Sequence, residues 1–246
     1  MAKLRHVAFI VKDPKKLYDF YHHLFGLEQV RLSPSGSIHV IDGLFNLAFL
    51  QQKLVESEAL TTHRADGSEI DQTQGINHYG FTVGNLAEAL ARLPATVTRG
   101  ESPRNGRPAE MRIVDPWGNR FDISSKGFLG REEKRLPGVR LVVVQTGSPE
   151  EAARFYESVL ELRKIQTLPD GTITLSDGDM SLALTRTRTI GRPGIQYLGI
   201  QVADWPATRA RAKDAGLDVP ARPGPDGDVR LRDPEGNLFV VSERGW

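Results

Sequence analysis

"RIVDPWGNRFDISS" (Arg112–Ser125) and "RLRDPEGNLFVVSE" (Arg230–Glu243) are two copies of one stretch, 118 residues apart (from 112 to 230). Each copy has an Asp-Pro turn, a Gly-Asn pair and then an apolar strand, the signs of turn and strand in succession. The copies differ inside the strand, where the first has Asp122 and the second has Val240. The chain is therefore built as a repeat, and the copies differ where one of them has a carboxylate inside a strand.

The repeat extends through both halves of the chain. "HVAFIVKDPKKLYDFYHHLFGLEQV" begins at His6 and "LVVVQTGSPEEAARFYESVLELRKI" begins at Leu141, an offset of 135 residues (from 6 to 141). Such register, kept over roughly forty residues, indicates true internal duplication. The second half is shorter mainly because it lacks the polar stretch Gln52–Gln74, which we interpret as a loop insertion.

Each half also repeats within itself. A strand followed by a turn and a helix begins at His6 and again at His78, and the same pattern begins at Leu141 and at Tyr197. Asp13-Pro14 supplies the cap and the first residue of a helix. Short strands separated by Gly and Asp turns follow. The pattern predicts an α+β protein with four βαβββ modules, in two domains at residues 1–126 and 137–246.

Composition excludes several kinds of function. The 246 residues carry a net charge of +1 with both signs interspersed, which indicates neither a nucleic-acid partner nor a membrane partner. The absence of cysteine excludes disulfides and thiolate chemistry. The apolar stretch near the N-terminus is too short for a signal peptide or a membrane span. We expect a cytoplasmic protein.

Three polar residues are predicted to share one face of the sheet in the first half. Side chains alternate along a strand, so His6, His78 and Asp122 point away from the helices, and Arg120 lies on the same face as Asp122. Two imidazoles and a carboxylate form a ligand set for a divalent metal. A lone strand histidine is more often simply a hydrogen-bonded residue. In the second half, however, all three positions have lost their polar ligand together: Leu141, Tyr197 and Val240.

These features resemble the vicinal oxygen chelate superfamily, which includes glyoxalase I, fosfomycin-resistance proteins, methylmalonyl-CoA epimerase and extradiol ring-cleaving dioxygenases. The resemblance implies that paired modules form two cup-shaped domains, with a metal in one cup bound by His6, His78 and Asp122. The family usually has Glu in place of Asp122. The position of a fourth glyoxalase ligand falls in the apolar stretch Ala48–Leu50, and Arg112 stands where extradiol dioxygenases have Tyr.

The resemblance implies a metal-dependent enzyme that acts on a small, oxygen-rich substrate by lyase- or isomerase-type chemistry. An Fe(II)-dependent extradiol-type dioxygenase and a small-ligand-binding or antibiotic-resistance protein are the alternatives. The cofactor is expected to be Fe²⁺, Mn²⁺, Zn²⁺ or Ni²⁺. His39 is a candidate general base, and Arg120 is a candidate for binding an anionic substrate. The expected partner is a small molecule, and the oligomeric state is left open, with a homodimer as one option.

Overall fold

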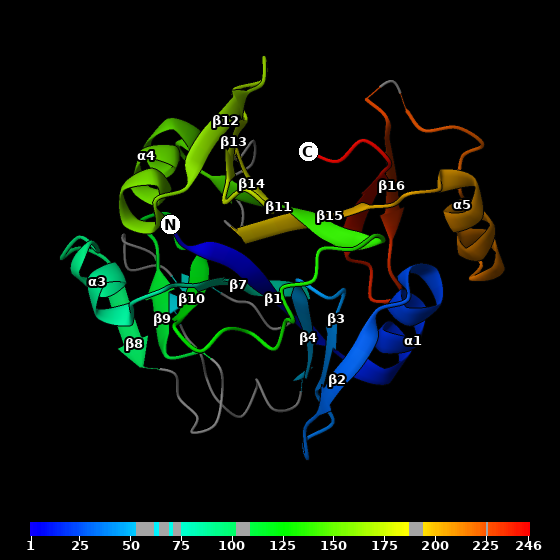
Figure 1. Cartoon of the computed structure of the whole chain (residues 1–246), viewed down its shortest axis with the longest axis horizontal. Coiled ribbons are helices and arrows are strands. Elements are labelled where there is room, and N and C mark those ends of the chain that lie inside the picture. The colour runs from blue at the N-terminus through cyan, green and yellow to red at the C-terminus, as the bar shows by residue number, and fades with distance from the viewer. Residues whose placement is uncertain (53–61, 64–68, 71–74, 102–108, 187–193, 225) are drawn as a thin grey trace.

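The computed structural model describes residues 1–52, 62–63, 69–70, 75–101, 109–186, 194–224 and 226–246 (Figure 1). The first half contains β1 (Lys3–Val11), α1 (Pro14–Phe25), β2 (Glu28–Leu32), β3 (Ile38–Ile41), β4 (Asn46–Gln51), β5 (Thr62–His63), β6 (Glu69–Ile70), β7 (Gly75–Thr82), α3 (Leu86–Ala91), β8 (Thr98–Glu101), β9 (Met111–Val114) and β10 (Arg120–Ser124). The second half contains β11 (Gly138–Thr146), α4 (Pro149–Leu160), β12 (Arg163–Thr167), β13 (Ile173–Ser176), β14 (Ser181–Arg186), β15 (Gly194–Gln201), α5 (Trp205–Asp214), β16 (Asp228–Arg232) and β17 (Leu238–Ser242). Most of the predicted insertion lies outside the described residues.

Each half forms one sheet. The strand orders are β2-β3-β4-β1-β7-β10-β9-β8 and β12-β13-β14-β11-β15-β17-β16, and β5 and β6 form a separate pair. In both sheets the first strands of two modules, β1 with β7 and β11 with β15, are antiparallel neighbours at the centre. Each sheet is therefore two modules joined at their first strands, which confirms the predicted α+β fold class. No helix among the described residues has the length and apolar character needed to cross a membrane.

The fourth module has one strand fewer than predicted. None of the described residues between α5 and β16 belongs to a strand. This segment contains Pro220 and Pro223. Proline has no backbone N–H to donate to a neighbouring strand and is therefore confined to edges and irregular segments. As a result β16 is the edge strand of the seven-stranded sheet.

The first helix begins and ends where local chemistry predicts. The Asp13 carboxylate accepts a hydrogen bond of 2.9 Å from the backbone N–H of Lys16, and Pro14 is the first helical residue. These interactions satisfy or remove donors that would otherwise lack partners at the helix start. Gly26 ends α1 with a φ of 69°, a left-handed conformation that glycine adopts without strain.

The helices of each half pack against the other half. α1 lies beside α5 (Figure 1), and the Tyr21 ring of α1 lies 5.9 Å from the Phe239 ring of β17. The Tyr21 hydroxyl donates to Asp233, whereas the Tyr156 hydroxyl of α4 donates to Asp115. Tyr21 and Tyr156 are related by the repeat, as are the two aspartates, so the contacts between the halves follow a pseudo-twofold symmetry.

Two buried ion pairs join the halves with the same symmetry. Arg5 contacts Asp177 at 3.2 Å, and Arg140 contacts Asp42 at 3.1 Å. One apolar cluster contains residues from both sheets, so the two halves share a core. The sheets draw on residues 3–124 and 138–242, and the division into domains at residues 1–126 and 137–246 stays a prediction. Independent folding of the two domains stays a prediction.

The outer face of the seven-stranded sheet is filled by its own side chains. We call this face the second cup. Leu141, Val143 and Ala183 are buried there, with Tyr197 and Trp246 packed against them. A Cβ atom on Gly199, beneath the indole, would lie 2.7 Å from a Trp246 ring carbon. The second cup is thus packed with apolar and aromatic groups at the positions related to His6 and His78.

Candidate functional site

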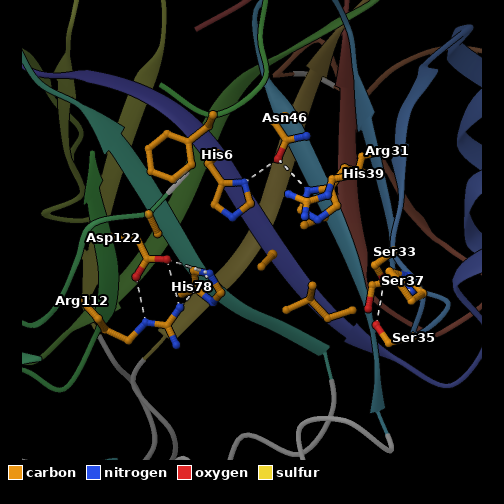
Figure 2. Close-up of a pocket in the computed structure, with 16 residues that line it drawn as sticks. His6, Arg31, Ser33, Ser35, Ser37, His39, Asn46, His78, Arg112 and Asp122 are labelled. Carbon is orange, nitrogen blue, oxygen red and sulfur yellow. Dashed lines mark hydrogen bonds and ion pairs between the residues drawn. The ribbon is translucent and has the colours of Figure 1, made fainter. Parts of the chain in front are cut away.

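The outer face of the eight-stranded sheet bounds a cavity of about 250 Å³, which we call the first cup (Figure 2). Strand alternation divides β1 as predicted, because Val7 and Phe9 enter the shared core and His6 and Ala8 line the cavity. The described lining includes three histidines, two arginines, one aspartate and three serines. The first cup is therefore polar where the second is apolar.

The structure brings the three predicted metal ligands to one side of this cavity. Gly80 pairs with His6 in β1 and with Asp122 in β10, so these two ligands lie in one row across the sheet. His78 precedes Gly80 by two residues in β7 and therefore points to the same face from the next row, opposite Ala8. The His78 Nε2 atom lies 3.3 Å from Asp122 Oδ2, and the rings of His6 and His78 are 5.4 Å apart between centroids. Each of the three residues is at most 6% exposed.

Two asparagines set the orientation of the histidine rings. His6 Nδ1 lies 2.7 Å from Asn46 Oδ1, and His78 Nδ1 lies 2.8 Å from Asn77 Oδ1. An amide oxygen only accepts, so each Nδ1 carries the hydrogen and each Nε2 keeps a lone pair. The Asn46 amide nitrogen donates to the Val40 carbonyl at 3.0 Å, which fixes the side chain. Such outer partners are typical of metal-binding imidazoles.

The protonation states also suit cation binding. Burial, followed by the positive charge of His78, lowers the pKa of His6 to about 3. Burial and then the Arg112 charge lower the pKa of His78 to about 4. Burial opposes ionisation of Asp122, but Arg112 and His78 outweigh it and hold the pKa of that carboxyl well below its usual range. At neutral pH the cup thus has two neutral imidazoles beside one carboxylate.

A guanidinium occupies the space between two of these groups. Arg112 stands directly opposite Asp122 in the β9–β10 pairing. Its Nε donates to Asp122 Oδ1 at 2.8 Å and its Nη2 donates to Asp122 Oδ2 at 3.0 Å. The same Nη2 lies 3.2 Å from His78 Nε2 (Figure 2). Arg112 therefore neutralises the Asp122 carboxylate through a bidentate, charge-assisted pair.

The donor chemistry fits a divalent cation, since it combines two unprotonated Nε2 atoms with an ionised carboxylate. The present arrangement of the atoms does not. Within the described part of the chain, no three His, Asp or Glu side chains are close enough together to hold a metal ion as they stand. Arg112 also contacts two of the three candidate ligands, because its N–H groups donate to the carboxylate oxygens of Asp122 and lie against the His78 lone pair.

The other two predicted site residues differ in position. His39 lines the first cup and lies 3.5 Å from Asn46 Oδ1 through its Nδ1. Arg120 is 3% exposed and is not among the described residues that line the cavity. Burial, followed by repulsion from Arg112, lowers its pKa to about 10. The second arginine in the lining is instead Arg31 of β2, which lies beside His39, its partner in the β2–β3 pairing (Figure 2).

Sequence reasoning missed the cover over His6. The Phe128 ring, from the segment between the halves, stacks on His6 with ring centroids 4.9 Å apart and planes 3° from parallel. A Cβ atom on Gly80 would lie 2.7 Å from a Phe128 ring carbon. Phe128 and Trp246 are separated by the same 118 residues as the opening repeat. Continuing the repeat past its last strand would have identified an aromatic cover in each half.

Comparison with known proteins follows the same division of the chain. The family model "Glyoxalase/Bleomycin resistance protein/Dioxygenase superfamily" matches residues 3–123, and a glyoxalase-like domain model matches residues 141–242. No curated protein matches the sequence.

Solved structures match over nearly the full chain. The Mn(II)-bound glyoxalase from Novosphingobium aromaticivorans has a TM-score of 0.73 and 16% identity, covering 99% of this chain and 83% of its own. The 2,3-dioxygenase LapB from Pseudomonas sp. KL28 has a TM-score of 0.69 and 14% identity, covering 99% and 92%. Homoprotocatechuate 2,3-dioxygenase from Brevibacterium fuscum, complexed with 3,4-dihydroxyphenylacetate, has a TM-score of 0.68 and 12% identity, covering 99% and 81%. At these identities the likeness shows the fold alone. The family models, which match residues 3–123 and 141–242, show that the chain belongs to the glyoxalase/bleomycin resistance protein/dioxygenase superfamily.

Proposed function

We propose that the first cup is the active site of a metal-dependent enzyme that acts on a small, oxygen-rich substrate by lyase- or isomerase-type chemistry. The observation that carries the proposal is the convergence of His6, His78 and Asp122 on one polar cavity. The related face of the second half is packed with apolar groups. A ligand set that is complete in one half and lost in the other is best explained by a single shared site.

Each residue has a distinct role in this proposal. His6 and His78 would bind the cation through Nε2, and Asp122 would bind it through its carboxylate. When bound, the cation would supply positive charge that stabilises an oxyanion developing on the substrate. His39 lines the same cavity and is the candidate for moving a proton to or from the substrate.

The polar lining of the first cup supports an acidic substrate. Arg31 lines the cavity and has no hydrogen-bond or ion-pair partner among the described residues. The serines at 33, 35 and 37 line the same cavity. Gln166 stands at the related position in the second half, so the positive charge of Arg31 is specific to the half that contains the first cup. A guanidinium and hydroxyl groups that line one cavity suit a carboxylate or phosphate.

An Fe(II)-dependent dioxygenase is the second candidate. Two histidines and one carboxylate are the ligand set of the facial triad, which leaves positions for dioxygen and substrate. Dioxygenases are also among the similar solved structures.

Metal content is the first test. Untagged protein should contain about one divalent ion per chain, whereas His6→Leu and Asp122→Val, which install the residues of the second half, should lose it. Equal metal content in the wild type and both variants would contradict the site. Oxygen uptake by the Fe(II)-loaded protein with catechols would select the second candidate, and its absence, with turnover of small acids in a substrate screen, would select the first.

A further inference from the structure

We propose that Arg112 is an internal competitor of the metal: the Arg112–Asp122 ion pair and a bound divalent cation exclude each other. The proposal rests on the proposed function only in assigning a metal to this cup. It explains why ligands of suitable chemistry face the cavity although Asp122 is already paired.

Arg112 occupies lone pairs that a bound cation would use. Two guanidinium nitrogens contact both oxygens of Asp122, and one of them also contacts the Nε2 lone pair of His78. A cation bound through His78 Nε2 would need the one lone pair of that nitrogen, whereas each oxygen of Asp122 has a second one. Arg112 must therefore release His78 before that residue can act as a ligand, and the Nη2 atom that makes this contact also pairs with Asp122.

The positive charge of Arg112 also opposes the binding of a cation. With neutral imidazoles, the charge of Asp122 is balanced by that of Arg112, and the aspartate and arginine side chains are 3% and 11% exposed. Adding a divalent cation beside an unmoved guanidinium would leave two excess positive charges in a poorly solvated site, where repulsion is strong. Withdrawal of Arg112 removes one of them. Because Arg112 lines the cavity, its guanidinium can turn toward the open part of the cup.

The second half shows where the related arginine lies when no carboxylate stands opposite it. Arg230 is related to Arg112 by the repeat and stands opposite Val240. Without a carboxylate across the strand, Arg230 pairs with Asp226 at 3.0 Å, and its side chain is 53% exposed. An arginine at this strand position is therefore able to point to solvent. The carboxylate is what holds the guanidinium of Arg112 in the cup.

The test is metal affinity. Chelator-treated wild type, Arg112→Met and Arg112→Lys should be titrated with Mn²⁺ and with Zn²⁺ near neutral pH, in competition with a fluorescent chelator. Arg112→Met removes the charge at similar length, so it should bind metal at least about tenfold more tightly than the wild type. Arg112→Lys keeps a charge but cannot form the bidentate pair, so its affinity should lie between the two.

Arg230→Met is the matched control, because it makes the same change at the related position of the second half, opposite Val240. Its metal affinity should equal that of the wild type. Equal or weaker binding by Arg112→Met than by the wild type would overturn the competition and leave the metal site standing. Binding by Arg112→Met alone would support the competition and contradict a resident metal in the native protein. If no variant binds metal, both ideas fail.

Discussion

The Arg112–Asp122 pair can be weighed by removing its charges singly and together from metal-free protein. Breaking a buried pair from one side costs about 3–5 kcal/mol, because the other charge is left without a partner. Arg112→Met should lower the free energy of unfolding by about 3 kcal/mol, since the Asp122 carboxylate is only 3% exposed. Asp122→Val should cost less, about 1–2 kcal/mol, because the freed guanidinium can turn to solvent, as Arg230 does.

The double variant tests whether the charges of Arg112 and Asp122 are coupled. Replacing both members of a buried ion pair with apolar groups is often nearly neutral. We therefore expect the Arg112→Met/Asp122→Val protein to lie within about 1 kcal/mol of the wild type, giving a coupling energy of about 3–5 kcal/mol. For a chain of this size, a loss of 3 kcal/mol lowers Tm by roughly 6–12 °C. Thermal and urea unfolding in the presence of a chelator would measure it. Additive effects of the two single changes would refute the pair as a buried, coupled unit.

Three further predictions concern the candidate metal ligands and their surroundings. In the metal-free protein the free energy of unfolding should fall as pH decreases from about 6.5, the unfolded pKa of histidine, toward about 4, because His6 and His78 have folded pKa values of about 3 and about 4 and only the unfolded chain takes up their protons. Urea titrations at several pH values should show a flatter dependence for the double variant His6→Leu/His78→Tyr. An unchanged slope would argue against these two histidines as its cause. Asn46→Ser should weaken Mn²⁺ binding by about 10–100-fold, the usual effect of losing the partner that orients a histidine ligand; an affinity equal to that of the wild type in the same titration would show that the amide does not orient His6. Gly80→Ala should destabilise the fold by about 1–3 kcal/mol through overpacking, because its Cβ would lie 2.7 Å from Phe128 and 3.1 Å from His6; adding Phe128→Leu should recover most of the loss, and no recovery would place the strain elsewhere.

Much of the fold could be predicted because it depends on local patterns. The N-cap at Asp13 and the left-handed Gly26 are set by interactions within a few residues, and side-chain alternation in β1 follows from strand geometry. Because the modules repeat, the same elements could be predicted at the related positions of the other modules. The missing strand of the fourth module is the exception, and the prolines at 220 and 223 were the available signal.

The candidate site could be predicted only in part. His6, His78 and Asp122 were selected because the second half provides an internal comparison at the same strand positions. His39 was named only as a candidate general base, and the structure places it in the lining of the first cup. Arg120 was chosen by the same rule but is buried outside the cavity lining, since alternation gives the face of a sheet and not the place where the face is open.

The sequence by itself determined the modules, their order, the face that bears the candidate ligands and the half in which all three occur. All of these follow from periodicity and repeat register, which are properties of neighbouring residues. Only the tertiary structure decided that Phe128 covers His6, that Asn46 and Asn77 orient the imidazoles, and that Arg112 holds Asp122. Most of these contacts join different strands or loops, and a ring stacking or a guanidinium reaching a carboxylate depends on strand order and side-chain direction in space. The charge state of the cup follows from that packing, because burial and the neighbouring guanidinium set the pKa values of its three candidate ligands.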